Sequence, residues 1–482
     1  MQLQPFAGPR QHGEGVAQGV GVVAGFRTAG DEDEQPVAGG GLGDEVRGTV
    51  LAGGEEGFEQ ARRPWNLAVE QHVLAVVEAA DADDVAALVR HASLAGLTIA
   101  TQPSGHGATG DTDGVILLRT IRLDALDIDP GERIARVGAG VTWGRVLEAT
   151  GAYGLAGLAG SSPVVTVTGY TLGGGLSWFG RRHGFASQSV RAFDVVDAIG
   201  ARARVTADSD PDLFWALRGG GGDFAVVTAI EFALHPAPRL YGGRLLWPAD
   251  QAPAVLDAYR QVTGAAPEEL TLWYDLLRFP GAAPMVAVDA TFLGDGGDAE
   301  ALMSPLEKIP GRLSDSRAML PIARLGSITA EPTDPGPGVT RAELLTGLTD
   351  EVAAALLRRP IDPLLSVQLR HLGGALARPS GTPAGRLEEP FALYLFGVPG
   401  QDGGAAVRER MRQSTGALVP HSGRKPFTFL AAGESAASAF TPDALARLRA
   451  LKRARDPRGI FRSDFPVLGV SAGGPEERSD RS

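Results

Sequence analysis

A strand–helix–strand unit between residues 73 and 107 constrains the fold of this chain more than any other feature. The apolar segment VLAVVEA, residues 73–79, predicts a short strand. Asp81 is placed to cap the next helix, whose apolar residues recur near helical spacing and which ends at Gly96. LTIATQ, residues 97–102, predicts a second strand that runs directly into the loop PSGHGATG. The unit therefore predicts an α/β layer with a glycine-containing loop at the end of its second strand.

Short strands follow this unit in quick succession. They are predicted near residues 115–118, 133–140 and 193–198, with short helices near 143–150 and 211–218 between them. The longest strand signal covers residues 224–236. Beyond Pro236, longer strands alternate with helices, which is typical of an antiparallel sheet covered by helices. Runs of strands with separated helices indicate an α+β fold.

Both ends of the chain differ from this pattern. Residues 1–43 are rich in Gly, Gln and acidic residues and show no period, so we expect a disordered extension or a wrongly chosen start codon. Residues 469–482 predict a second loose tail.

Composition excludes several classes of function. The net charge is −12 and no cluster of Lys and Arg is found, which argues against a nucleic-acid surface. The chain has no cysteine, so it holds no disulfide, thiolate zinc site, iron–sulfur cluster or cysteine nucleophile. No apolar run reaches the roughly 18 residues of a membrane span, and the N-terminus lacks the pattern of a signal peptide. We expect a cytoplasmic protein with a small-molecule substrate.

Three glycine-rich loops follow strands: residues 103–110, 160–175 and 218–223. Glycine permits close backbone approach, so successive N–H groups of such loops can bind a pyrophosphate. The nicotinamide-binding alternative fails, because Trp143 occupies the position of the third glycine after Gly138 and Gly140. The three loops together favour another nucleotide cofactor, although each alone could be a simple turn. His106 lies within the first loop, where a ligand can approach it.

Four ordered segments resemble the vanillyl alcohol oxidase/p-cresol methylhydroxylase superfamily of flavoproteins, especially its berberine bridge enzyme-like branch. PSGHGATG resembles the loop whose histidine bonds covalently to FAD, and GSSPVVTVTGYTLGGGLSWFGRRHG resembles the second flavin loop. DLFWALRGGGGDFAVVTAIEFALHP resembles the end of the flavin domain, and LKRARDPRGIFRSDFPV the closing segment. The resemblance covers residues 61–468.

The resemblance implies a flavin domain of two α+β lobes and a substrate domain with an antiparallel sheet covered by helices. The expected boundaries are residues 44–236 for the FAD-binding domain, 237–415 for the substrate domain and 416–468 for a segment that returns to the FAD domain. FAD is the implied cofactor, attached through His106 and not through a cysteine. The remaining residues implied to bind FAD are Ser104, Gly105, Gly107, Ala108, Ser161, Ser162, Gly169, Gly173, Gly174 and Val227.

The chain departs from the family at several positions. Ser162 stands where members with two covalent bonds have cysteine. Val165 occupies the position of the oxygen gate, where valine is associated with oxidases and a bulkier leucine with slower reaction. Pro426 and Thr428 replace the usual Tyr and Asn, and Arg378 stands at the position of the catalytic carboxylate.

The positions that carry the catalytic base in the family therefore hold other residues in this chain, and the base must be sought elsewhere. A base must lie within hydrogen-bond reach of the proton that a substrate alcohol loses. His371, Tyr274 and Tyr394 lie on predicted strands of the substrate domain and are the candidate catalytic residues, together with Val165. Each could equally be a half-buried sheet residue.

The predicted function is an FAD-dependent oxidoreductase, specifically an oxidase. It would oxidise an alcohol, a sugar or a secondary-metabolite carbon and pass the electrons to dioxygen. Two alternatives remain open at this point: a dehydrogenase of the same fold with another acceptor, and a flavin-binding protein without activity. The sequence does not choose among substrates and gives no oligomeric state.

Overall fold

The computed structural model describes residues 41–358 and 360–469. Most of the expected N-terminal extension and C-terminal tail lies outside these residues. Helix α1 (Leu42–Glu45) lies at the expected boundary between residues 43 and 44, and its Leu42 is completely buried. Residues 41–469 fall within one compact unit, so the predicted boundaries inside that range stay predictions.

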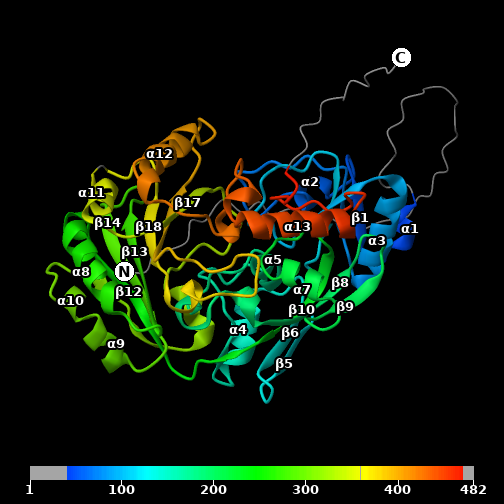
Figure 1. Ribbon diagram of the computed structural model, residues 1–482. Coiled ribbons are helices and arrows are strands. Elements are labelled where there is room, and N and C mark those ends of the chain that lie inside the picture. The colour runs from blue at the N-terminus through cyan, green and yellow to red at the C-terminus, as the bar shows by residue number, and fades with distance from the viewer. Residues whose placement is uncertain (1–40, 359, 470–482) are drawn as a thin grey trace, which may run out of the picture. The chain divides into compact units, whose positions relative to one another are not determined.

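The first sheet contains the strand–helix–strand unit (Figure 1). Its strands follow the order β1 (Thr49–Ala52), β2 (Ala75–Glu78), β4 (Val115–Arg119) and β3 (Thr98–Thr101). Helix α3 (Ala82–Ala95) begins where the Asp81 carboxylate accepts the Asp83 and Asp84 N–H groups, and ends at Gly96 with φ +68°. The predicted cap and stop are confirmed, and helix α2 (Phe58–Ala61) precedes β2.

The second sheet is antiparallel and completes the N-terminal half. Its strands follow the order β5 (Leu126–Asp129), β6 (Ile134–Gly138), β10 (Val226–Ala233), β8 (Val190–Val196) and β9 (Arg202–Val205). A small ladder joins β7 (Leu155–Ala156) to β11 (His235–Pro236). The helices of this half are α4 (Trp143–Gly151), α5 (Val167–Leu172), α6 (Gly180–His183) and α7 (Pro211–Leu217). Trp143, Trp178 and Phe193 are almost fully buried in the core between these elements.

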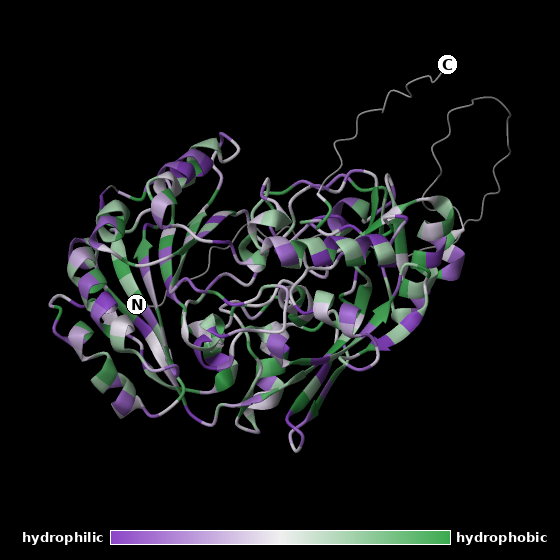
Figure 2. Cartoon of the chain, in the orientation of Figure 1, coloured by the Kyte–Doolittle hydropathy of each residue, from purple (hydrophilic) through white to green (hydrophobic). Residues whose placement is uncertain are grey.

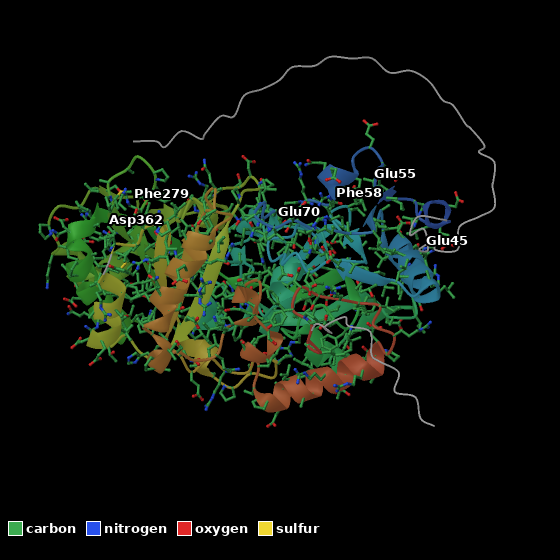
Figure 3. All side chains as sticks on the ribbon, turned by 90° about the horizontal axis from the view of Figure 1, so that it is seen from above. Glu45, Glu55, Phe58, Glu70, Phe279 and Asp362 are labelled. Atoms are coloured by element: carbon green, nitrogen blue, oxygen red, sulfur yellow. The ribbon has the colours of Figure 1, made fainter. Side chains whose placement is uncertain are left out.

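The third sheet is antiparallel and has eight strands. Its main path runs through β15 (Ser314–Asp315), β12 (Leu240–Pro248), β14 (Met285–Phe292), β13 (Leu270–Leu277), β18 (Ser366–His371), β19 (Phe391–Gly397) and β17 (Val339–Leu345), while β16 (Ala318–Leu320) pairs with β12. The helices of this part are α8 (Ala252–Ala265), α9 (Gly296–Leu302), α10 (Ser304–Glu307), α11 (Asp350–Leu357) and α12 (Ala405–Gly416). Exposed Phe279 lies near Asp362 at the edge of this part, where Asp362 pairs with Arg278 (Figure 3).

Alternation along the strands of the third sheet gives it two different faces. One face is apolar and packs against α8 and its neighbours, with Leu272, Leu369 and Leu393 in its core. The opposite face, here called the polar face, carries Asp275, Asp289, Gln368, Arg370 and Tyr394. Figure 2 shows hydrophobic and hydrophilic residues together on these strands.

The C-terminal helix α13 (Pro442–Arg455) lies across the N-terminal half (Figure 1). Lys452 is 4% exposed, and its ammonium group donates to the Asp456 carboxylate and to the carbonyls of Asp223 and Phe461. The chain then runs beside β3, where Ile99 exchanges backbone hydrogen bonds with Ile460 and Arg462. The closing segment thus contacts the strand that leads into the His106 loop.

Candidate active site

The loop that carries His106 connects β3 to β4 and is held from two sides. On one side Trp65 donates its backbone N–H to the Ser104 carbonyl over 2.8 Å. On the other side the Asp464 carboxylate accepts the Thr109 N–H over 3.2 Å. Gly105 has φ +77°, and a Cβ at this position would lie within 2.9 Å of Pro64. A larger residue would therefore displace the loop from the segment that covers it.

The His106 imidazole is fixed in place and is largely buried. The Ser104 hydroxyl lies 2.8 Å from Nδ1, and the Trp65 ring stacks on the imidazole with centroids 4.2 Å apart. Burial lowers the pKa of His106 to about 4, so the ring is neutral at pH 7. Nε2 is buried and has no partner among the described residues. When Nδ1–H donates to Ser104, the lone pair remains on Nε2, which makes this atom a nucleophile.

The second loop is attached to the start of α4 by its backbone. The N–H groups of Trp143 and Gly144 donate to the carbonyls of Val165 and Pro163, at 3.0 and 2.8 Å. The Val165 side chain is partly buried against the core. These bonds fix the backbone path of the loop that precedes α5.

The predicted flavin residues of the second loop lie on both sides of α5. Ser161 and Ser162 precede the helix, Gly169 is exposed within it, and Gly173 and Gly174 follow it. Gly174 has φ +99°. The third glycine loop packs here, because a Cβ at Gly219 would lie 3.4 Å from the Gly174 Cα. In the structure, Gly219 therefore contributes to packing on the second loop.

Tyr170 of α5 is a residue that the sequence did not single out. A Cβ on Gly175 would come within 2.5 Å of its ring, so glycine at that position makes room for the phenol. The Tyr170 hydroxyl is buried and has no partner in the part of the chain that the structure describes. Burial raises the pKa of Tyr170, while the charge of Arg370 acts in the opposite direction.

Two of the candidate bases lie on the apolar face of the third sheet, because their positions alternate with those of the polar residues. Tyr274 is 1% exposed, and its hydroxyl donates to the Ala252 carbonyl of α8. His371 is 5% exposed and lies within hydrogen-bond distance of Arg181. Burial and the charge of Arg181 lower the pKa of His371 to about 3. Both side chains are thus partnered on the apolar face, and their catalytic roles stay predictions.

Tyr394 lies on the polar face. The guanidinium of Arg370 lies over its ring, with Cζ 4.8 Å from the centroid, and the Phe429 ring is 5.4 Å away. Burial raises the pKa of Tyr394, and the charge of Arg370 partly opposes that effect. Of the predicted bases, Tyr394 is therefore the one that shares this face with other polar groups.

A buried carboxylate, Asp275, is the second residue that the sequence analysis missed. Its oxygens accept from the Ser366 hydroxyl at 2.7 Å and from the Gln368 amide at 3.4 Å. Burial raises the pKa of Asp275 to about 7, against the effect of Arg244. Alternation is the signal that could have revealed these residues, since Ser366, Gln368 and Arg370 alternate with apolar residues along β18.

Other predicted positions have different surroundings. Arg378 is exposed and pairs with Glu268. Thr428 packs against the second loop, since a Cβ at Gly173 would lie 3.4 Å from its Cβ. Val227 is 3% exposed within β10, which leaves its backbone as the part available to a cofactor. Ala108 is buried and Gly107 is exposed in the first loop.

The residues fit the flavin nucleotide that the resemblance implies. The first loop offers a neutral, fixed imidazole whose Nε2 is unpartnered among the described residues. The second loop offers the exposed Gly169 within α5 and, after the helix, Gly174 at positive φ. No cluster of three metal-ligating side chains occurs in residues 41–358 and 360–469. Within the same residues no helix is long and apolar enough to cross a membrane.

Known proteins match this arrangement in sequence and in fold. Residues 73–206 match the family model of an FAD binding domain. The chain is 27% identical to (R)-6-hydroxynicotine oxidase of Paenarthrobacter nicotinovorans over 447 residues, which cover 88% of this chain and 97% of that protein. The crystal structure of 6-hydroxy-D-nicotine oxidase from Arthrobacter nicotinovorans superposes with a TM-score of 0.76 at 25% identity, covering 86% of this chain and 97% of that one. Berberine bridge enzyme from Eschscholzia californica shares the fold, with a TM-score of 0.76 at 20% identity over 89% of this chain and 98% of that one.

Proposed function

We propose that this chain, an FAD-dependent oxidoreductase with the fold of berberine bridge enzyme, is an oxidase with FAD covalently attached through His106. The observation that carries the proposal is the state of the imidazole. It is neutral, held by Ser104 and Trp65, and unpartnered at Nε2 within the described chain. A neutral nitrogen with a free lone pair is the form that can bond to an electrophilic carbon.

The remaining contacts to FAD would come from both loops. Ser104, Gly105, Gly107 and Ala108 surround the anchor, while Ser161, Ser162, Gly169, Gly173 and Gly174 offer backbone and hydroxyl groups near α5. The backbone of Val227 in β10 is a further proposed contact. The sequence has no cysteine, so no second bond through a cysteine is proposed.

Bound FAD supplies a two-electron acceptor for a substrate C–H bond and a donor to dioxygen. The protein must then bind the substrate over the polar face and take up the proton that its hydroxyl or amine loses. We propose that Tyr394 would hydrogen-bond this hydroxyl or amine. Burial raises the pKa of Tyr394, so its phenol is protonated and would have to lose its own proton before it could act as the base, a loss that the charge of Arg370 favours. Val165, partly buried beside the second loop, is the proposed determinant of access for dioxygen.

The substrate is a small molecule such as an alcohol, a sugar, an amine or a secondary metabolite. The similarity to a hydroxynicotine oxidase supports a ring-containing substrate. The aromatic rings of Tyr394 and Phe429, which flank Arg370, also support a ring-containing substrate.

The oxidase proposal is tested by the two half-reactions measured separately. Anaerobic addition of a substrate panel should bleach the bound flavin, and air should then restore its colour with one hydrogen peroxide formed per flavin. Slow reoxidation in air, with rapid reoxidation by another acceptor, would instead identify a dehydrogenase. A flavin that no compound reduces would favour a binding protein without activity.

A further inference from the structure

Arg370 lies at the centre of the polar face. Across the sheet it is opposite Trp273 on one side and Ala392 on the other. Its Cζ lies 4.0 Å from the centroid of the Trp273 ring and 5.1 Å from that of Phe429. Together with Tyr394, these rings enclose the guanidinium, although Arg370 retains some accessible surface.

The guanidinium is only partly satisfied by the protein. Its Nε donates to the Gln368 side-chain oxygen over 2.6 Å. Within residues 41–358 and 360–469, its terminal nitrogens have no hydrogen-bond partner and no carboxylate lies within 4.0 Å. Arg244 on the same face is different, because the Asp289 carboxylate binds it through two bonds of 2.6 and 2.8 Å. An enclosed cation without an anion is costly.

The groups around Arg370 hold it in one orientation. Gln368 accepts from Arg370 and donates to Asp275, so the amide links the guanidinium to a buried carboxylate. The other titratable groups whose charge acts on Arg370 are Tyr394, Glu331 and Tyr170. Burial lowers the pKa of Arg370 against the combined effect of these groups, which is the expected behaviour of a cation that lacks a direct counter-ion.

We propose that the terminal guanidinium nitrogens of Arg370 bind an oxyanion on the substrate, a carboxylate or an ionised phenol attached to an aromatic ring. The inference rests on the proposed function, since it names the substrate class of the same site. Two guanidinium N–H groups match the two oxygens of a carboxylate, and one suffices for a phenolate. Tyr394 and Phe429, whose rings flank the guanidinium, would pack against the ring of the substrate. Trp273, in contrast, is already stacked between Trp178 and Arg370. The Tyr170 hydroxyl, which has no partner among the described residues, is a second candidate donor.

Direct binding tests the inference without requiring turnover. The probes are benzoate for the carboxylate, 4-nitrophenolate for the phenolate and benzamide as the neutral analogue of benzoate. Each is titrated into the flavin-loaded protein while tryptophan fluorescence and the shift in melting temperature are recorded. We expect benzoate or 4-nitrophenolate to bind at least about tenfold more tightly than benzamide, because a hydrogen bond to a charged group contributes that much.

Variants locate the binding to this residue. Arg370→Met should weaken binding of the anionic probe by about tenfold or more and leave benzamide unchanged, while Arg370→Lys should retain part of the preference. Arg278→Met is the matched control, because Arg278 follows β13 and already has a carboxylate partner, the exposed Asp362. The affinities of Arg278→Met for the three probes should equal those of the unmodified protein.

Three outcomes would overturn the inference. They are affinities for both benzoate and 4-nitrophenolate that are no higher than the affinity for benzamide, full anion binding by Arg370→Met, and an Arg370→Met protein whose flavin reduction potential changes while its anion affinity does not. The last result would assign Arg370 to the cofactor. Flavin content, measured on the same samples, separates these outcomes from a failure of the proposed function, which would appear as protein that binds no flavin.

Discussion

Trp65 stacks on His106, with ring centroids 4.2 Å apart and ring planes 16° apart. The neighbours of Trp65 extend this contact to the third sheet. Its backbone bonds to Ser104 on one side and Gly336 on the other, and Asn66 exchanges hydrogen bonds with Gly338. A single short segment therefore covers the proposed flavin anchor and connects it to the part of the chain that would bind substrate.

Replacing Trp65 tests whether this cover keeps His106 neutral. Burial holds the pKa of His106 near 4, so covalent incorporation of FAD into apoprotein should be independent of pH down to about 5. In Trp65→Ala the hydrated imidazole should return toward its ordinary pKa near 6.5, and incorporation should fall steeply as pH drops below that value. Acid-stable flavin per protein, followed with time at pH 5.5 and 8, measures the effect. Trp215→Ala, which removes an aromatic ring of α7 that packs against Arg447, should retain the profile of the unmodified protein.

Lys452 determines how firmly the closing segment is attached. Lys452→Met removes the donor to Asp456 and to two carbonyls, and it leaves a buried carboxylate without its cation. The free energy of unfolding should fall by about 3 kcal/mol, as expected when one partner of a buried ion pair is removed. Denaturant unfolding measures the loss. The neighbouring exposed Arg453→Met provides the control, and equal stability of the two variants would contradict this role.

The strand–helix–strand unit and the antiparallel sheet could be predicted because their signals are local. Asp81 and Gly96 bound α3 as expected, and strand alternation identifies a two-faced sheet. The orientation of single strand residues was harder to predict, because a shift of one residue exchanges the two faces. His371 and Arg370 are adjacent in sequence but lie on opposite faces of β18, and the sequence analysis considered only His371.

Contacts between segments that are far apart in the sequence leave no pattern in the residues around them, so they could not be predicted. The stacking of Trp65 on His106 and the position of Tyr170 between glycines depend on chain packing that spacing does not encode. The covalent flavin and its loops remain predictions from resemblance that the geometry supports.

Asp275 should make stability depend on pH in a defined direction. Its pKa is about 7 in the folded chain and lower in the unfolded one, so its contribution to stability is present in acid and is lost as pH rises from about 4 to 7. Asp275→Asn should therefore gain stability relative to the unmodified protein at pH 8 and gain little at pH 4.5. Urea unfolding at the two pH values gives the difference. Asp127→Asn, at an exposed residue of β5, should show no such dependence, and a gain that does not grow with pH would contradict the argument.

Substitution of Val165 tests the proposal that this residue controls the access of dioxygen to the flavin. Val165→Leu adds one methylene beside the second loop and should slow reoxidation of the reduced flavin several-fold, while the rate of reduction by substrate stays unchanged. Stopped-flow mixing of reduced protein with oxygenated buffer separates the two rates. Val164→Leu, at the adjacent partly buried residue, controls for general disturbance of the loop. Unchanged reoxidation in Val165→Leu would remove Val165 from the route.

The central claim is that His106 anchors the flavin. Acid precipitation of the purified protein, followed by a denaturing gel viewed under ultraviolet light, tests it most directly. We expect flavin fluorescence to migrate with the unmodified chain and to be absent from His106→Ala, which should still fold and bind FAD reversibly. Flavin that washes away from the unmodified protein, or remains attached to His106→Ala, would contradict the assignment.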